Sequence, residues 1–201
     1  MGENNSPVFF YLYMGAERIF MGNNMPQRKN IRLKDYDYSK EGMYFITICV
    51  KDRKCILSKI VGNDALVVPT QLGENIIKCW NNIEILNENI SLGEFVIMPD
   101  HIHGIIIINN GNDNEFQNPN KKYGFEISER RGRRSLQGII KDFKSVTTRI
   151  YNKCIFDNEM KNNLWQKSYY EHIIRNEKEY YKICEYITNN PLKWEEDEYN
   201  K

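Results

Sequence analysis

Hydrophobic positions follow two different periods along this chain, which predicts a fold that mixes strands and helices. Residues 43–50 form an unbroken β-branched and aromatic run, Met-Tyr-Phe-Ile-Thr-Ile-Cys-Val, that ends at polar residues 51–53. Such a run is typical of a buried strand. In residues 71–86 the apolar side chains instead recur at steps of three and four, which predicts an amphipathic helix. They are Leu72, Ile76, Trp80 and Ile83.

The middle of the chain predicts a β-hairpin. Two apolar runs, residues 94–98 and 101–108, are separated by Pro99 and Asp100, a pair that favours a turn. Asn, Gly and Asp are then frequent in residues 109–123, so we expect a surface loop there.

Two further helices are predicted in the last third of the chain. The first follows Ser135, a residue type that caps helices, and its apolar stripe extends to Ile150. Residues 165–174 are expected to be extended in part, and residues 176–189 suit a helix ended by Pro191. Because strands and helices interleave without regular βαβ alternation, we expect an α+β fold. It would be a largely antiparallel central sheet with helices packed against one face.

Length and composition are those of one folded domain with extensions. The 201 residues are 41% apolar and 12% aromatic, which is enough for a core. We expect a loose leader over 1–25, the domain over 26–194 and an acidic tail over 195–201. No apolar run approaches the roughly 18–20 residues that cross a bilayer, and we expect no secretory signal. Five scattered cysteines without a CxxC pair favour reduced thiols in the cytoplasm over a disulfide framework or a four-thiolate zinc site.

Two histidines, His101 and His103, carry the most specific chemical signal. Because they are two residues apart on a strand, both imidazoles project from one face while Ile102 points into the opposite layer. Imidazole is the commonest protein ligand of metal ions, so the pair could provide half of a metal site. Packing or surface histidines show the same spacing, and the pattern alone leaves both interpretations open.

A second signal lies at the end of the last predicted helix. Tyr186 and Asn190 are one turn apart and share a face if the helix runs that far. A tyrosine can act as a covalent nucleophile, and an amide oxygen can bind a hard divalent cation. In a chain with 13 tyrosines, a packing tyrosine followed by an ordinary Asn-Pro helix stop is the alternative.

Basic residues are concentrated in one segment, although the formal net charge is only +1. Residues 121–153 contain ten basic and three acidic residues, a local net charge of +7. Neutralising backbone phosphates is the main sequence-independent source of nucleic-acid affinity, and a solvated basic face is the alternative. The candidate DNA contacts are Arg130, Arg131, Arg133, Arg134, Lys141 and Lys144.

Taken in order, these segments resemble the HUH single-tyrosine transposases, and within them the REP-associated tyrosine transposases. The resemblance rests on Met-Pro-Asp-His-Ile-His-Gly at 98–104 and on Tyr-Ile-Thr-Asn-Asn-Pro at 186–191. Segments 28–47, 135–145 and 165–177 support it. It implies an HUH endonuclease domain with a ferredoxin-like fold. Asparagine at position 190, where many insertion-sequence relatives have glutamine, favours the REP-associated branch.

The resemblance also implies an activity and the residues that perform it. His101 and His103 would be a metal-binding pair, Asn190 a third ligand to Mg²⁺ or Mn²⁺, and Tyr186 the nucleophile. The substrate would be single-stranded DNA next to an imperfect palindromic hairpin. Attack by the tyrosine would give a 5′-phosphotyrosine and a free 3′-hydroxyl, and the strand could be rejoined without ATP.

Other functions stay open at this point. The protein could be a mobile insertion-sequence transposase, acting as a homodimer that places the Tyr186 helix on the partner's histidines. It could be a non-catalytic protein that binds hairpin DNA and regulates, or a metal-dependent hydrolase that forms no covalent adduct. Tyr169 and Tyr170 are weaker candidates for the nucleophile, because isoleucines occupy the positions one turn later. His172 is expected to be structural or on the surface.

Overall fold

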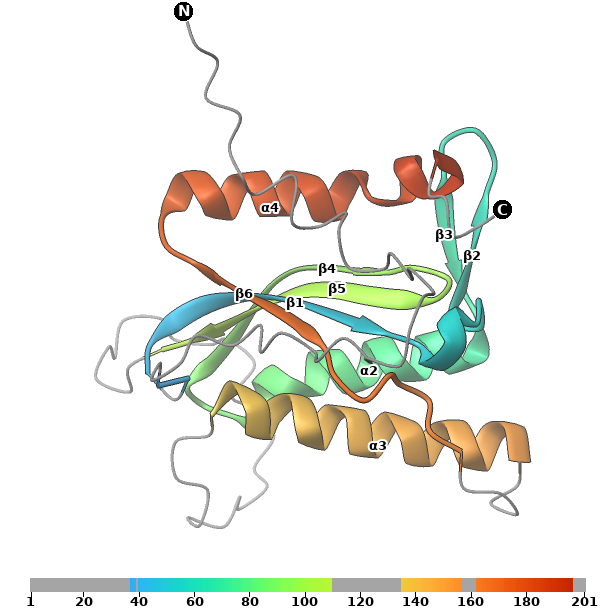
Figure 1. The fold of residues 1–201 in the computed structure, drawn as a ribbon, viewed down its shortest axis with the longest axis horizontal. Helices are drawn as coiled ribbons and strands as arrows, with labels where there is room; N and C mark the ends of the chain where they lie inside the picture. The colour runs from blue at the N-terminus through green and yellow to red at the C-terminus, as the bar shows by residue number, and fades with distance from the viewer. Residues whose placement is uncertain (1–36, 39, 110–134, 157–161, 197–201) are drawn as a thin grey trace, which may run out of the picture. The chain divides into compact units, whose positions relative to one another are not determined.

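A four-stranded antiparallel sheet forms the centre of the fold (Figure 1). The structure is a computed structural model that describes residues 37–38, 40–109, 135–156 and 162–196. The strands lie in the order β4, β5, β1, β6, with bounds Ile90–Ile97, His101–Ile108, Gly42–Cys49 and Tyr170–Ile174. The predicted leader, the predicted loop after Asn109 and the last five residues of the tail lie outside the described residues.

Helices cover both faces of this sheet, which corrects the expectation that they pack on one face. α2 (Gln71–Leu86) and α3 (Leu136–Phe156) lie on one face, and α4 (Glu177–Asn189) lies across the other (Figure 1). The burial of β5 explains why α4 forms a second helical layer. Six consecutive residues at its start are buried, so both alternating sets of side chains need cover.

The elements expected from hydrophobic periodicity are confirmed. α2 has the predicted bounds, and its N-cap Thr70 accepts a hydrogen bond from the Gly73 N–H at 3.1 Å. α3 begins after Ser135, whose Oγ accepts from the Gly138 N–H at 3.3 Å, and it continues past Ile150. None of the helices in the described ranges has the length and apolar character needed to cross a lipid bilayer.

The larger core lies between the sheet and the α2–α3 layer. Trp80 of α2 is 1% exposed and stacks on Phe95 of β4, with ring centroids 4.9 Å apart. It also packs edge-to-face with Phe143 of α3, with ring centroids 5.5 Å apart. Gly104 of β5 gives this indole its space, because a Cβ at that position would overlap the Trp80 ring. Hydrophobic burial therefore fixes the strand that carries the two histidines.

A two-stranded ribbon, β2 (Ser58–Val61) and β3 (Leu66–Pro69), was not expected from the sequence. Each strand has only four residues, which is too short for a clear period. Gly62 turns the chain between them with a φ of 72°, in the left-handed region that favours glycine. The Ser58 hydroxyl donates to the Ile97 carbonyl at 3.0 Å and so joins the ribbon to the end of β4.

Candidate active site

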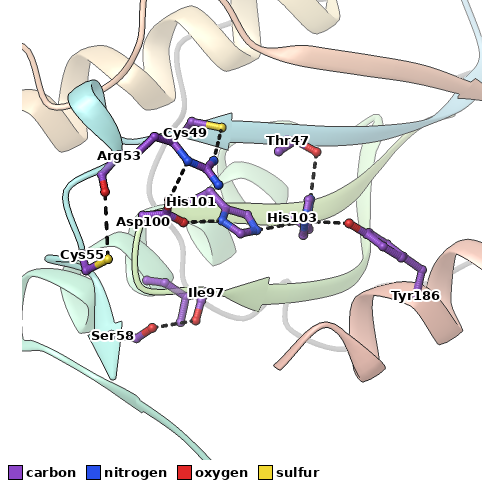
Figure 2. A network of polar contacts seen from close by, with 10 residues as sticks. All are labelled: Thr47, Cys49, Arg53, Cys55, Ser58, Ile97, Asp100, His101, His103 and Tyr186. Atoms are coloured by element: carbon purple, nitrogen blue, oxygen red, sulfur yellow. Dashed lines mark hydrogen bonds and ion pairs between the residues drawn. The ribbon is translucent and has the colours of Figure 1, made fainter. Parts of the chain in front are cut away.

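The side chains of His101 and His103 lie next to each other on the face of β5 that α4 covers (Figure 2). Their Nε2 atoms are 3.0 Å apart and their ring centroids 4.5 Å apart. Both residues are buried, whereas the intervening Ile102 is buried in the opposite layer. The strand therefore presents two imidazole nitrogens at one point.

Each ring is held from behind by a second polar group. His101 donates from Nδ1 to Oδ1 of Asp100 at 2.6 Å, and Nδ1 of His103 lies 2.8 Å from the Thr47 hydroxyl (Figure 2). Thr47 reaches this position because the register of β1 with β5 places it opposite His103. Such partners fix the orientation and the proton position of metal-binding imidazoles.

The hydrogen-bond network assigns the imidazole protons. Because His101 has its proton on Nδ1, its Nε2 is an acceptor, and the 3.0 Å contact requires a proton on Nε2 of His103. The Thr47 hydroxyl then donates to Nδ1 of His103. A hydroxyl can also accept, so the proton of His103 can move to Nδ1 and leave both Nε2 lone pairs for a cation.

An ion pair closes the site beside His101. Arg53 donates from Nε to Oδ2 of Asp100 at 2.6 Å, and Asp100 is 1% exposed. Arg53 also donates from Nη1 to Sγ of Cys49 at 3.0 Å (Figure 2). Its backbone φ of 54° lies in the left-handed region, which costs a non-glycine residue on the order of 1 kcal/mol. Asp100 thus supports the imidazole of His101 from behind and is itself neutralised.

The protonation state of His103 favours cation binding. Burial, followed by electrostatic interactions with His101 and Arg53, holds the pKa of His103 well below its usual value of 6.5. His103 is therefore neutral at pH 7, which is the form that can offer a lone pair. Burial also raises the pKa of the Cys49 thiol, although Arg53 acts to lower it, so the neighbouring sulfur is protonated.

Tyr186 brings a phenol to the histidine pair from α4 of the same chain. Its Oη lies 3.4 Å from Nε2 of His103, and the two ring centroids are 5.3 Å apart (Figure 2). Phe45 of β1 contacts both rings. It stacks on His103 at 5.3 Å and meets Tyr186 edge-on at 6.0 Å, measured between centroids. One buried aromatic side chain thereby positions two residues that are 83 positions apart.

Helical backbone continues far enough to place Asn190 one turn after Tyr186. α4 ends one residue earlier, and Asn190 keeps a φ of −59° and a ψ of −41°. The two residues therefore share a helix face. The 3-10 segment Pro191–Glu196 follows, and its Trp194 ring lies 6.2 Å from that of His101.

The donor set fits a divalent cation held by ligands of mixed type. Two nitrogens that bind one ion at about 2.1 Å and at a right angle lie about 3 Å apart, and the Nε2 atoms of His101 and His103 have this separation. In the part of the chain that the structure describes, no group of three or more His, Cys, Asp or Glu side chains could hold a metal ion. A further ligand must be of another type, such as the amide oxygen of Asn190 or a substrate oxygen.

Only two of the predicted DNA contacts lie in described residues, and both are on α3. Lys141 is exposed, and Lys144 is half-buried and donates from Nζ to the Gln166 carbonyl at 2.7 Å. The other four lie outside the described residues. They are Arg130, Arg131, Arg133 and Arg134.

Two other residues considered in the sequence have contacts of their own. Tyr170 of β6 meets the Phe45 ring edge-on, with centroids 6.3 Å apart. His172 pairs through Nε2 with Oε1 of Glu179 at 2.8 Å, which joins β6 to the first turn of α4. The contact of His172 is a structural one.

Sequence reasoning gave no site role to Asp100, Arg53, Thr47 or Phe45. Asp100 offered a signal, because a carboxylate beside a metal-binding histidine is a common partner of its second ring nitrogen. Its expected roles are only those of a turn residue and a member of the motif at 98–104. The other three reach the histidines or Asp100 through tertiary contacts, which periodicity does not encode.

Comparison with solved structures gives the class of fold. The chain resembles the structure of a REP-associated tyrosine transposase bound to a REP hairpin, with a TM-score of 0.50 and 20% sequence identity. The match covers 81% of this chain and 73% of the other. The two share an α+β fold with a mostly antiparallel sheet. The α+β fold that the sequence predicts is therefore confirmed.

Sequence comparison gives the family. No protein-family model matches the chain. A Haemophilus influenzae protein of uncharacterized function is 39% identical over 173 residues, which is 85% of this chain and 92% of that protein. The chain belongs to the same family as this Haemophilus protein.

Proposed function

We propose that this protein is a metal-dependent single-stranded DNA endonuclease and transposase, which nicks and rejoins DNA next to hairpins through a 5′-phosphotyrosine. One observation carries the proposal. Within one chain, the phenolic oxygen of Tyr186 lies 3.4 Å from a buried histidine nitrogen, which is itself 3.0 Å from a second imidazole. The two motifs and the transposase-like fold support the same assignment.

The proposal includes a divalent cation, Mg²⁺ or Mn²⁺, with His101, His103 and Asn190 as its ligands. When bound, it would polarise the scissile phosphate and neutralise the charge that develops there. Asp100 and Thr47 keep the two rings turned so that their Nε2 atoms face each other. Because these partners are fixed by β1 and β5, little reorganisation precedes the reaction.

The proposed step exchanges one phosphate ester for another. The phenolic oxygen of Tyr186 attacks phosphorus, and the bond from phosphorus to the 3′ oxygen breaks. The phenol loses its proton, and the released 3′ oxygen gains one. A phenol has a pKa near 10, so attack needs the proton to leave as the new bond forms. The ester is preserved as phosphotyrosine, so reverse attack by a 3′-hydroxyl rejoins the strand.

The proposed substrate is a single strand beside a hairpin. A REP-associated tyrosine transposase with this fold is bound to a REP hairpin, and we extend that class of ligand to this chain. An unpaired strand can bend to bring its phosphate to Tyr186, whereas a duplex backbone resists this. Because Tyr186 and the histidines meet within one chain, we propose that a monomer is sufficient for nicking and that residues 26–194 form the catalytic domain.

Covalent capture tests the function. Labelled hairpin-flanked single strands are incubated with the protein and Mn²⁺ and are then separated under denaturing conditions. We expect a protein–DNA band with the wild type and none with Tyr186→Phe, which removes one oxygen and keeps the ring. Tyr170→Phe is the matched control and should keep the band. It removes a phenol from the same face of the sheet, since Tyr170 pairs with Thr47.

Each alternative predicts a different gel. Equal bands from the wild type and Tyr186→Phe would assign the nucleophile to another residue. Hairpin binding without a band at any divalent metal would favour the non-catalytic regulatory protein. Cleavage without a band would favour the simple hydrolase.

A further inference from the structure

A groove with a strongly basic lining runs along α3 beside the segment 163–167. Its volume is about 760 Å³. Five of its lining side chains are cations, and none of those that the structure describes there is acidic. The cations are Lys51, Lys141, Lys144, Arg149 and Lys167. This lining selects a ligand with several negative charges.

The cations of α3 form a row. Lys141 and Lys144 are three residues apart and Lys144 and Arg149 are five residues apart, and together they cover about 12 Å along the axis. Lys51 and Lys167 add positive charge from two other segments. A single phosphate cannot contact a row of this length, whereas successive phosphates of a nucleic-acid backbone can.

Hydrogen bonds hold the segment beside α3 in place. Lys144 donates from Nζ to the carbonyls of Gln166 and Lys167 at 2.7 and 3.2 Å. Trp165 donates from Nε1 to the Thr147 hydroxyl at 2.8 Å. The groove is thus formed before any ligand binds, and its exposed cations Lys141 and Arg149 remain at its surface.

The groove adjoins the candidate active site through the end of β1. Gln166 donates its N–H to the Cys49 carbonyl at 2.9 Å, and Trp165 bridges to Val50 like a neighbouring strand. On the other side of β1, Cys49 is the cross-strand partner of His101. Two strand spacings, about 10 Å along the sheet, therefore separate the backbone of Gln166 from that of His101.

We propose that this groove binds the sugar–phosphate backbone of the single DNA strand that flanks the scissile phosphate. This rests on the proposed function, because the strand is taken to continue from the site between Tyr186 and His103. The contacts are to phosphates, so binding is independent of base sequence and falls steeply with salt.

Binding is measured apart from cleavage, in the Tyr186→Phe background. Fluorescence anisotropy reports the Kd of a labelled oligothymidylate of about 15 nucleotides over a salt series. Lys141→Gln/Arg149→Gln should raise the Kd roughly tenfold at low salt. It should also reduce the slope of log Kd against log salt by about 1.4, since each lost single-strand contact removes about 0.7. Lys78→Gln, at an exposed lysine of α2 outside the groove, should change neither.

Four results would overturn the proposal. The first is an unchanged Kd and slope in the double variant, and the second is an equal change in Lys78→Gln. The third is a Kd for a duplex of equal length that depends more strongly on Lys141 and Arg149 than the Kd for the single strand does. The charge-preserving Lys141→Arg/Arg149→Lys variant should keep the Kd of the protein with Lys141 and Arg149. A weaker Kd in this variant is the fourth result that would overturn the proposal.

A second measurement separates this proposal from the proposed function. In protein with Tyr186 intact, Lys141→Gln/Arg149→Gln should raise KM for adduct formation and leave kcat within about twofold. If the adduct forms and the double variant binds and reacts like the wild type, the groove assignment fails and the proposed function stands. If no adduct forms but affinity still depends on the groove, the groove remains a single-strand site and the proposed function fails.

Discussion

The two faces of the central sheet are built from the same strands, yet they differ in chemistry. Along β5, Ile102 and Ile106 join the apolar core that packs against α2 and α3, while His101 and His103 lie toward α4. Successive side chains of a strand point to opposite faces, so the isoleucines and the histidines lie on different sides of the sheet. The α2–α3 face supplies free energy of folding, and the α4 face holds buried polar groups at fixed distances.

The faces also differ in how strictly their contacts depend on geometry. Apolar contacts are non-directional and scale with buried area. On the α4 face, His101 and His103 depend on Asp100 and Thr47, and a buried polar group that loses its partner costs about 1–3 kcal/mol. Variants on the two faces should therefore separate stability from activity.

The largest effect is expected from two adjacent residues that point to opposite faces. His103→Ala should slow adduct formation roughly a thousandfold, because it removes a proposed metal ligand. Ile102→Ala should lower the free energy of unfolding by about 3–4 kcal/mol through the cavity it leaves, with little change in rate per folded molecule. Urea unfolding and gel-based adduct rates measure the two quantities. Parallel losses of both in both variants would mean that the faces are not separate.

A smaller effect is expected where the apolar face constrains the motif itself. Gly104→Ala should lower the free energy of unfolding by about 2–3 kcal/mol, because the new Cβ would overlap the Trp80 ring. Gly138→Ala on α3 is the matched control. Its Cβ would meet only Ser135 Oγ at 3.6 Å, and alanine in a helix should stabilise by about 0.5 kcal/mol. Denaturant titrations compare the two, and a neutral Gly104→Ala would refute this packing.

On the α4 face, a substitution at Asp100 tests whether the orientation of the His101 imidazole affects metal affinity when both histidines are kept. Asp100→Asn keeps the shape but removes the charge that Arg53 and His101 share, so Mn²⁺ affinity should fall about 10- to 100-fold. Ser58→Ala is the control, since it removes a buried hydroxyl bonded to the Ile97 carbonyl. Calorimetric titration measures the affinity. Wild-type affinity in Asp100→Asn would show that the carboxylate does not position His101.

Periodicity predicted the elements whose patterns are long or local. The stripe of α2 and the turn at Pro99–Asp100 were sufficient to place a helix and a hairpin. The ribbon of β2 and β3 was missed because four-residue strands carry little periodic signal. The prediction that all helices pack on one face of the sheet was wrong for α4, because the amphipathic stripe of a helix does not indicate which face of a sheet the helix covers.

The candidate site likewise has a part that the sequence predicts and a part that depends on tertiary packing. His101, His103 and Tyr186 stand in motifs that the sequence displays, but the 3.4 Å approach of the phenol depends on how α4 crosses the sheet. Lys51 and Lys167 lie outside the basic segment 121–153. Both line the groove beside α3, because the backbone at the end of β1 pairs with Trp165. Amino-acid composition does not reveal this pairing.

The smallest effect is expected where α4 is attached to β6. Glu179 accepts from the Arg175 N–H and contacts Nε2 of His172, both at 2.8 Å. Burial acts to raise the pKa of Glu179, but these two partners lower it more, so the net pKa lies below 4.5. A lowered folded-state pKa adds stability above the unfolded-state pKa, and that stability is lost as the pH falls through the folded-state value.

Glu179→Gln should therefore reduce the free energy of unfolding by about 1 kcal/mol at pH 7. The difference from the wild type should shrink as the pH falls below 4.5. Denaturant titrations at the two ends of this range measure it, and a difference independent of pH would contradict the ionic contact.

The identity of the residue that carries the DNA tests the central claim most directly. The covalent adduct is trapped, digested with nuclease and protease, and the modified peptide is sequenced by mass spectrometry. We predict a nucleotide linked through its 5′ phosphate to the oxygen of Tyr186. A nucleotide on Tyr170, or on any residue other than Tyr186, would contradict the assignment of the nucleophile.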